Sequence, residues 1–168
     1  MSRLAQALAC AFCLAVGMAA AADRPAGIPS VVDGDTLDLH GQRIRLWGID
    51  APESRQLCRH DGRPWRCGQA AALALADRIG RHTVHCEVRD VDRWKRLIAI
   101  CRRAGEDLSA WMVRNGLALA FRRYAKDYVQ AENDARLARR GLWSGAFAPP
   151  WAWRRDKAAA LVTAAAQP

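Results

Sequence analysis

DGDTLDLHGQRIRLWGIDAPE, residues 33–53, is the stretch from which both the fold and the chemistry of this chain can be predicted. Apolar and polar residues alternate on both sides of a Gly41-Gln42 dipeptide, which is the pattern of two strands joined by a tight turn. Pro52 cannot continue a central strand, so the second strand should end by Asp50. Such a hairpin brings carboxylate and guanidinium groups together at its ends.

The flanking sequence predicts further short strands and helices. Alternating apolar residues predict strands, and Ala- or Leu-rich stretches that end at a glycine predict helices. The expected strands cover 28–32, 36–40, 43–49, 82–88 and 96–101, and the expected helices cover 68–79, 108–115 and 127–140. A helix inserted after three short strands is typical of a barrel of OB type. We therefore expect an α+β, mainly β fold: a five-stranded OB-type barrel with three helices.

The N-terminal residues have the order of a secretory signal. Arg3 precedes an apolar run that reaches about residue 20, and three alanines then precede the first acidic residue, Asp23. An N-terminal membrane anchor is the alternative, although the run is short and rich in alanine for a bilayer span. We expect a signal peptide at 1–22, one domain at 23–156 and a flexible C-terminal tail at 157–168.

The chain is strongly basic. It holds 26 Lys and Arg against 17 Asp and Glu, a formal net charge of +9. Such a charge attracts polyanions over a long range, and nucleic acid is the obvious candidate. Basicity that serves only solubility is the other explanation of the same charge.

Four cysteines follow the expected signal peptide, and an even number in an exported protein indicates disulfides. Three pairings are possible. We favour Cys58 with Cys67, which closes a short loop, and Cys86 with Cys101, which joins two predicted neighbouring strands.

Asp35 and Asp50 each lie at the end of a predicted strand, about fifteen residues apart across the hairpin. Two carboxylates that meet there repel each other unless a cation lies between them. Oxygen ligands without His or Cys favour Ca²⁺ or Mg²⁺ over zinc. The alternative is that these residues serve only the turns, and for Asp33 we favour that explanation.

Three further residues could complete a phosphodiester-cleaving site. Glu53 follows a rigid proline and could accept a proton from a water that attacks phosphorus. Arg45, on the strand that leads to Asp50, could bind phosphate oxygens through two N–H groups, and Arg96 could stabilise the charge of the transition state. Each residue alone is more simply explained as a solvated charge, so the hypothesis rests on the set.

Three motifs in this order and spacing, DGDT, RLWGIDAPE and DRWKRLIA, resemble the staphylococcal nuclease (thermonuclease) family. The resemblance runs from about Val31 to Trp143 and includes GLA at 116–118 and RRGLW at 139–143. It implies an OB-type barrel and a Ca²⁺-dependent phosphodiesterase that acts on DNA and RNA.

The resemblance also implies a role for each matching residue. Asp35 and Asp50 match the calcium-binding carboxylates, and Ala51 matches a position that offers calcium a backbone carbonyl. Glu53 matches the general base, and Arg45 and Arg96 match the two phosphate-binding arginines. We expect the neighbouring residues Arg93, Trp94 and Lys95 to contact substrate, although Trp94 stands at a position of Tyr and Lys95 at one of Gly.

The sequence therefore predicts a secreted or periplasmic nuclease that uses Ca²⁺, acts as a monomer without membrane association in its mature form, and leaves 3′-phosphate ends. Two alternatives stay open. One is a catalytically inactive OB module that binds nucleic acid or a protein. The other is an exported structural protein whose acidic residues bind Ca²⁺ for stability alone. The sequence does not distinguish DNA from RNA as the preferred substrate, or internal from terminal cleavage.

Overall fold

The computed structural model describes residues 24–165, with side chains as far as Lys157, so the predicted signal peptide at 1–22 lies outside the described residues. The elements are β1 Ala26–Gly27, β2 Ser30–Asp33, β3 Thr36–Leu39, β4 Gln42–Leu46, β5 Ile49–Asp50, β6 Cys58–His60, β7 Arg63–Trp65, α1 Cys67–Ile79, β8 Val84–Val91, β9 Leu97–Arg103, β10 Glu106–Asp107, α2 Leu108–Arg114, β11 Leu119–Ala120, α3 Val129–Leu137, a 3₁₀ turn Gly141–Ser144 and α4 Pro150–Ala165.

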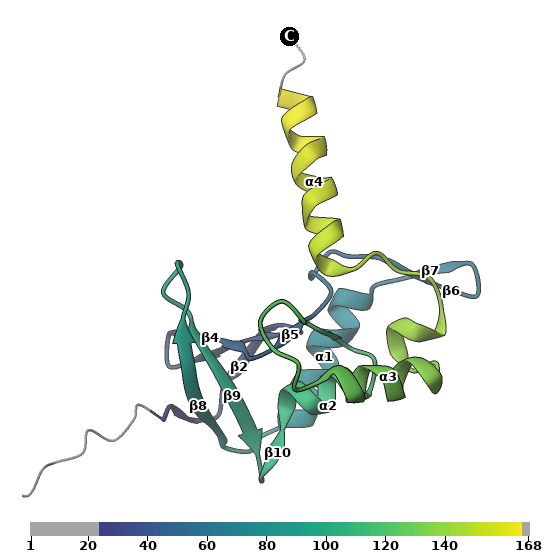
Figure 1. Ribbon diagram of the computed structural model, residues 1–168. Helices are drawn as coiled ribbons and strands as arrows, with labels where there is room; N and C mark the ends of the chain where they lie inside the picture. Colours follow the sequence, from purple (N-terminus) through teal and green to yellow (C-terminus); the bar gives the residue numbers. More distant parts are fainter. Residues whose placement is uncertain (1–23, 166–168) are drawn as a thin grey trace, which may run out of the picture.

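One curled sheet forms the body of the molecule (Figure 1). Its strand order is β1-β8-β9-β4-β3-β2, with β10 added to β9. Its neighbouring strands are antiparallel except β4 and β9, which are parallel and pair Arg45 with Ile98. A small second sheet pairs β5 with β11, so Asp50 lies opposite Leu119. The predicted hairpin is thus confirmed as β3 and β4, and the α+β, OB-type fold is confirmed with it.

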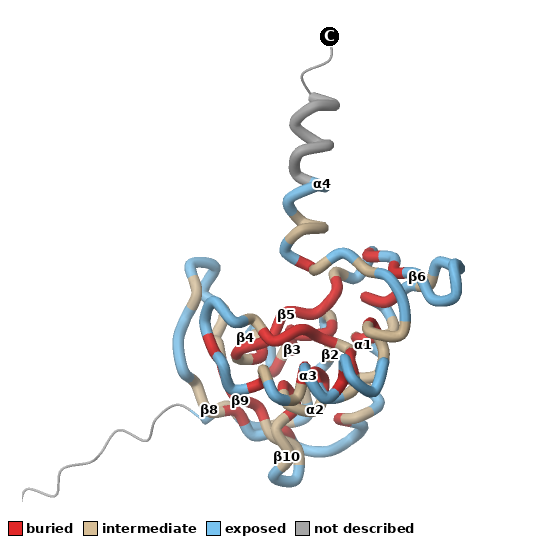
Figure 2. The backbone as a smooth tube through the Cα atoms, turned by 45° about the vertical axis from the view of Figure 1, so that its right-hand side comes forward, coloured by how far each residue is buried: buried red, intermediate tan, exposed pale blue. Residues whose placement is uncertain are grey.

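Alternating side chains of the hairpin fill the core between the sheet and helices α1 and α2. Leu37 and Leu39 of β3 and Ile44 and Leu46 of β4 are buried. Figure 2 shows the buried backbone as a band through β3, β4 and β5, with exposed residues at the turns. Removal of this apolar surface from water is the main favourable term of the fold. It also fixes the register, because a shift of one residue would turn every apolar side chain to the wrong face.

Helix α2 begins where the sequence predicts. Asp107 has an extended backbone, and its carboxylate accepts a hydrogen bond of 3.1 Å from the Ala110 N–H, which is the geometry of an N-cap. The other oxygen of Asp107 accepts the hydroxyl of Tyr128 at 2.9 Å. The cap therefore also ties α2 to the start of α3.

Both favoured disulfides are present. Cys58–Cys67 joins the β6–β7 hairpin to the start of α1, and Cys86–Cys101 links directly opposed residues of β8 and β9. The pairing follows from the strand register, which sets Cys86 against Cys101.

The structure contains one helix that was not predicted. Helix α4 runs from Pro150 to Ala165 and takes in the first residues of the segment predicted as a tail, so residues 24–165 hold four α-helices where three were predicted. Helix α4 starts at a Pro-Pro step and projects away from the body (Figure 1). Proline favours the first turn of a helix because it lacks an N–H that would otherwise go unpaired there. Within residues 24–165, no helix is both long enough and apolar enough to cross a membrane.

Candidate active site

The ends of β3, β4 and β5 bring two aspartates to one point. Asp35 closes a tight turn in which its N–H donates to Asp33 Oδ1 at 3.0 Å, so Asp33 has the turn role that the sequence favours. Asp50 is fully buried on β5, and Asp35 is only 3% exposed. The Ala51 N–H donates to Asp35 Oδ2 at 2.9 Å, which joins the two chain segments directly.

Arg45 lies between these carboxylates. It donates from Nη1 to Asp35 Oδ1 at 3.0 Å and from Nη2 to Asp50 Oδ1 at 2.7 Å. Burial alone lowers the pKa of this guanidinium, but the two carboxylates outweigh burial, so its pKa is raised and it stays charged. The Arg45 guanidinium therefore forms ion pairs with two buried carboxylates, Asp35 and Asp50.

The environment of Asp35 disfavours its charge. Burial raises the pKa of Asp35 from 3.8 to about 7, and the carboxylates of Asp33 and Asp50 add to the rise, against the lowering effects of Arg45 and the Ala51 N–H. A cation bound beside Asp35 would favour the charged form of this carboxylate.

This raised pKa gives a prediction for the metal-free protein. The folded state binds a proton at Asp35 that the unfolded state has lost, so stability falls as pH rises from about 4 to about 7. We expect Asp35→Asn to flatten the decline of Tm between pH 5.5 and pH 8, and to raise Tm at pH 8 by at least about 3 °C. Thermal unfolding followed by circular dichroism in chelator measures both. A decline as steep in the variant as in the wild type would contradict the pKa of Asp35.

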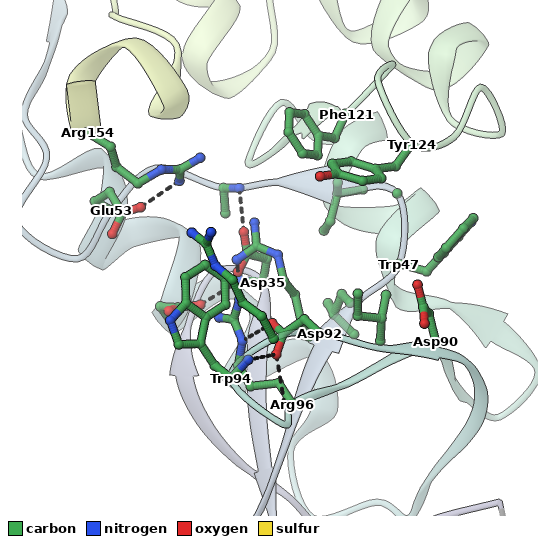
Figure 3. A pocket seen from close by; sticks show the side chains of 18 of the residues that line it. Asp35, Trp47, Glu53, Asp90, Asp92, Trp94, Arg96, Phe121, Tyr124 and Arg154 are labelled. Atoms are coloured by element: carbon green, nitrogen blue, oxygen red, sulfur yellow. Dashed lines mark hydrogen bonds and ion pairs between the residues drawn. The ribbon is translucent and has the colours of Figure 1, made fainter. Parts of the chain in front are cut away.

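Glu53 lies in the loop after Pro52, on the wall of the same cavity (Figure 3). Its N–H donates to Oε1 of Gln56 at 3.2 Å, and the fully buried Gln56 donates in turn to the Ala148 carbonyl at 2.7 Å. A Cβ at Gly68 would lie 1.8 Å from the Glu53 carbonyl oxygen, so only glycine lets α1 approach this loop. The backbone of Glu53 is therefore fixed by Gln56 at its N–H and by the close packing of Gly68 at its carbonyl.

Arg154 was not predicted from the sequence. It reaches from the first turns of α4 into the cavity and donates to Asp50 Oδ2 at 2.8 Å, Asp50 Oδ1 at 3.1 Å and Glu53 Oε1 at 2.7 Å. Burial lowers the pKa of Arg154, but its bonds to Asp50 and Glu53 outweigh burial and raise it. The only nearby signal is the Trp- and Pro-rich segment at 143–153, which predicts an ordered strap without indicating which side chain enters the site.

The turn between β8 and β9 forms the opposite wall. Asp92 accepts hydrogen bonds from the Trp94 N–H at 2.9 Å, the Arg96 N–H at 3.0 Å and Arg96 Nε at 2.7 Å. These bonds outweigh the effect of burial and lower the pKa of Asp92. Trp94 is 62% exposed, and the guanidinium groups of Arg93 and Arg96 lie 4.1 Å and 5.2 Å from the centre of its ring.

Lys95 differs from its predicted neighbours in the site. Its φ of 64° lies in the left-handed region that favours glycine. Its side chain is exposed and does not line the cavity, whereas Arg93, Trp94 and Arg96 do. Lys95 therefore shapes the turn through a conformation that a lysine adopts less readily than a glycine.

The cavity between these walls has a volume of about 830 Å³. Asp35 and Arg45 are among the residues that line it. Phe121 and Tyr124 stand on one side of it (Figure 3). The structure thus brings most of the predicted residues to one cavity. All of them line it except Asp50, which is hydrogen-bonded to the lining residue Arg45. They are Asp35, Arg45, Asp50, Ala51, Glu53, Arg93, Trp94 and Arg96.

The donor set fits a hard divalent cation bound partly by substrate and water. Within residues 24–165, no group of three or more His, Cys, Asp and Glu side chains forms a closed metal cage. Two adjacent buried carboxylates supply only oxygen ligands, and Ca²⁺ and Mg²⁺ accept carbonyl and water oxygens to complete their shells.

Comparison with known proteins identifies the family. A family described as "Staphylococcal nuclease homologue" matches residues 43–145. The micrococcal nuclease of Shigella flexneri is 34% identical over 168 aligned residues, with 89% of this chain and 91% of the relative covered.

Two further relatives show the range of the family. The succinoglycan biosynthesis protein ExoI of Rhizobium meliloti is 36% identical, with 74% of this chain and 68% of the relative covered. An uncharacterized endonuclease of Escherichia coli is 34% identical, with 81% of this chain and 88% of the relative covered. The family match spans most of the barrel and helices α1 to α3, including Arg45, Asp50, Glu53 and Arg96. By this match and these identities, the chain belongs to the staphylococcal nuclease homologue family.

Proposed function

We propose that this protein is an exported nuclease that uses Ca²⁺ to hydrolyse phosphodiester bonds of DNA, RNA or both, by direct attack of water, and leaves 3′-phosphate ends. Membership of the family makes the chain a nuclease-type hydrolase. One observation carries the rest of the proposal: the buried Asp35 and Asp50 share Arg45 beside a cavity that Arg45, Glu53 and Arg96 line.

Arg45 and Arg96 bind the phosphate in this proposal. A guanidinium offers a planar fork of N–H donors that matches two phosphate oxygens. Because both arginines are held by carboxylates, Arg45 by Asp35 and Asp50 and Arg96 by Asp92, they need little reorganisation as charge grows on the phosphate oxygens. Trp94 offers an exposed ring for a base or sugar next to the scissile phosphate.

Glu53 is the general base. Its carboxylate lies on the cavity wall, where it can accept the proton of a water aimed at the phosphorus. The bonds of Gln56 to the Glu53 N–H and the Ala148 carbonyl fix the loop that carries it. Asp35, Asp50 and the Ala51 carbonyl would hold the Ca²⁺, which when bound offsets the negative charge of the phosphate.

The alternative is a barrel that binds nucleic acid or a protein without cleaving it. A binder for a polyanion gains nothing from Asp35, Asp50 and Glu53 in its binding cavity, since they repel phosphate. The burial of Asp35 and Asp50 with Arg45, and the pairing of Asp50 and Glu53 with Arg154, suit a site that changes its charge when a cation binds, which favours the hydrolase.

Export is supported by the two disulfides, because such bonds persist in oxidising compartments. The mature protein would act in the periplasm or outside the cell, as a monomer free of the membrane.

The test is an assay of the purified protein on plasmid DNA and on a single-stranded RNA, with Ca²⁺ or with chelator. We expect degradation with Ca²⁺ and none with chelator, and 3′-phosphate ends in the products. Binding of either nucleic acid without cleavage, at every Ca²⁺ concentration, would support the inactive module instead. Calcium-dependent melting without either binding or cleavage would support a purely structural role of the cation.

A further inference from the structure

A guanidinium from α4 occupies the carboxylates that the proposed reaction requires to be free. Arg154 bonds both oxygens of Asp50 and one oxygen of Glu53. In the proposed function these are a cation ligand and the general base. Figure 3 shows the Arg154 side chain reaching down from α4 to Glu53, at the edge of the cavity.

Arg154 differs from Arg45 in how it is held. Arg45 belongs to β4 inside the barrel, and 20% of its side chain is exposed, against 40% for Arg154. Arg154 belongs to a helix that projects from the body (Figure 1). The first turn of α4 is anchored by Trp151, whose ring stacks on Phe121 at 6.0 Å between centres. Arg154 can therefore leave its carboxylates through a change of side-chain rotamer, whereas Arg45 cannot leave without disturbing the sheet.

Charge decides whether Arg154 and a divalent cation can share the site. Asp35, Asp50 and Glu53 carry up to three negative charges, and Arg45 and Arg154 carry two positive ones. Arg154 bonds both oxygens of Asp50. A divalent cation bound to that carboxylate would stand close to the Arg154 guanidinium and repel it.

We infer that Arg154 is an internal competitor of the divalent cation: it holds Asp50 and Glu53 in the metal-free protein, and the cation must displace it in order to bind. This inference rests on the proposed function, which supplies the cation. It adds that the affinity of the site for Ca²⁺ is set by a residue outside the barrel. It also means that one oxygen of the general base, Glu53 Oε1, is bonded to Arg154 until the cation arrives.

Calorimetric titration of the full chain with Ca²⁺ alone, without nucleic acid, tests this inference. Charged hydrogen bonds of the kind that Arg154 makes are worth roughly a tenfold change in affinity or more. We expect Arg154→Gln to bind Ca²⁺ about tenfold more tightly than the wild type. Arg154→Lys should show a smaller gain, because lysine keeps the charge but lacks the fork that engages both oxygens of Asp50.

Arg155→Gln is the matched control. It removes the same charge one residue away. The Arg155 side chain is 75% exposed, and its ion pair with Asp156 is a long one, 3.9 Å from Nε to Oδ1. The Arg155→Gln protein should therefore bind Ca²⁺ with the affinity of the wild type. A second readout is the rise of Tm with Ca²⁺, which tighter binding makes larger in Arg154→Gln. If that variant fails to fold, tighter binding by Arg154→Lys decides the question in the same way.

The outcomes separate this inference from the proposed function. Equal or weaker Ca²⁺ binding by the Arg154 variants, while wild-type cleavage still depends on calcium, would overturn the competition alone. Equally tightened binding in Arg155→Gln would also overturn it, since long-range charge would then explain the effect. Absence of Ca²⁺ binding by the wild type and by every variant would contradict both.

Discussion

Glu53→Gln is expected to lower the rate of DNA cleavage by at least about a hundredfold at saturating Ca²⁺. The substitution keeps the size of the side chain but removes the group that accepts a proton from the attacking water. The backbone bonds of Glu53 to Gln56 do not involve the carboxylate, so the loop should keep its shape. Initial rates on a labelled oligonucleotide measure the effect, and the loss should fall on kcat rather than on KM.

Glu87→Gln serves as the control for Glu53. Glu87 lies on β8 and pairs with Arg89 at 3.1 Å and Arg102 at 3.6 Å, and it does not line the cavity. Its variant should cleave at the wild-type rate. Cleavage by a folded Glu53→Gln protein within a few-fold of the wild-type rate would remove Glu53 from the role of base.

Arg45→Ala is expected to lower both the rate of cleavage and the stability of the protein. Loss of a preorganised donor to the developing charge typically costs about a hundredfold to a thousandfold in rate. The substitution also leaves the buried Asp35 and Asp50 without their shared cation, which costs about 3 kcal/mol or more in the free energy of unfolding. Cleavage rates and urea unfolding in chelator measure the two effects.

Two further variants help to interpret this result. Arg45→Lys separates the effect of the charge from that of the guanidinium geometry, and Arg43→Ala is a control on the same strand. Lysine keeps the charge but not the two-pronged contact, so we expect most of the stability and little of the activity to return. Arg43 lies on the same strand, pairs with Asp38 at 3.1 Å and has a 49% exposed side chain, so its loss should change neither quantity much. Cleavage at the wild-type rate by either Arg45 variant would contradict a phosphate-binding role.

The fold was largely predictable because its signals are local. The alternation that gives β3 and β4 their buried face, the Asp107 cap of α2 and the glycine after α1 can each be read within a few residues. The Cys86–Cys101 disulfide was predictable once its two strands were expected to be neighbours, and the Cys58–Cys67 disulfide because it closes a short loop. The grouping of Asp35, Arg45 and Asp50 was predictable because the three residues lie on one hairpin and its continuation.

The rest depends on contacts between distant segments. Arg154 lies 104 residues from Asp50, and no spacing in the sequence links the two. Gln56 is a fully buried polar residue in a segment that reads as a solvated loop, and its role depends on the Ala148 carbonyl, 92 residues away. Helix α4, which begins at the Pro-Pro step and runs into the alanine-rich C-terminal segment, was not predicted either.

A crystal structure with Ca²⁺ and a short deoxyoligonucleotide tests the central claim most directly. The proposed function predicts anomalous density for one ion bound by the carboxylates of Asp35 and Asp50, and a phosphate in contact with Arg45 and Arg96. An ion bound elsewhere, or an oligonucleotide on another face with this cavity empty of phosphate, would contradict it.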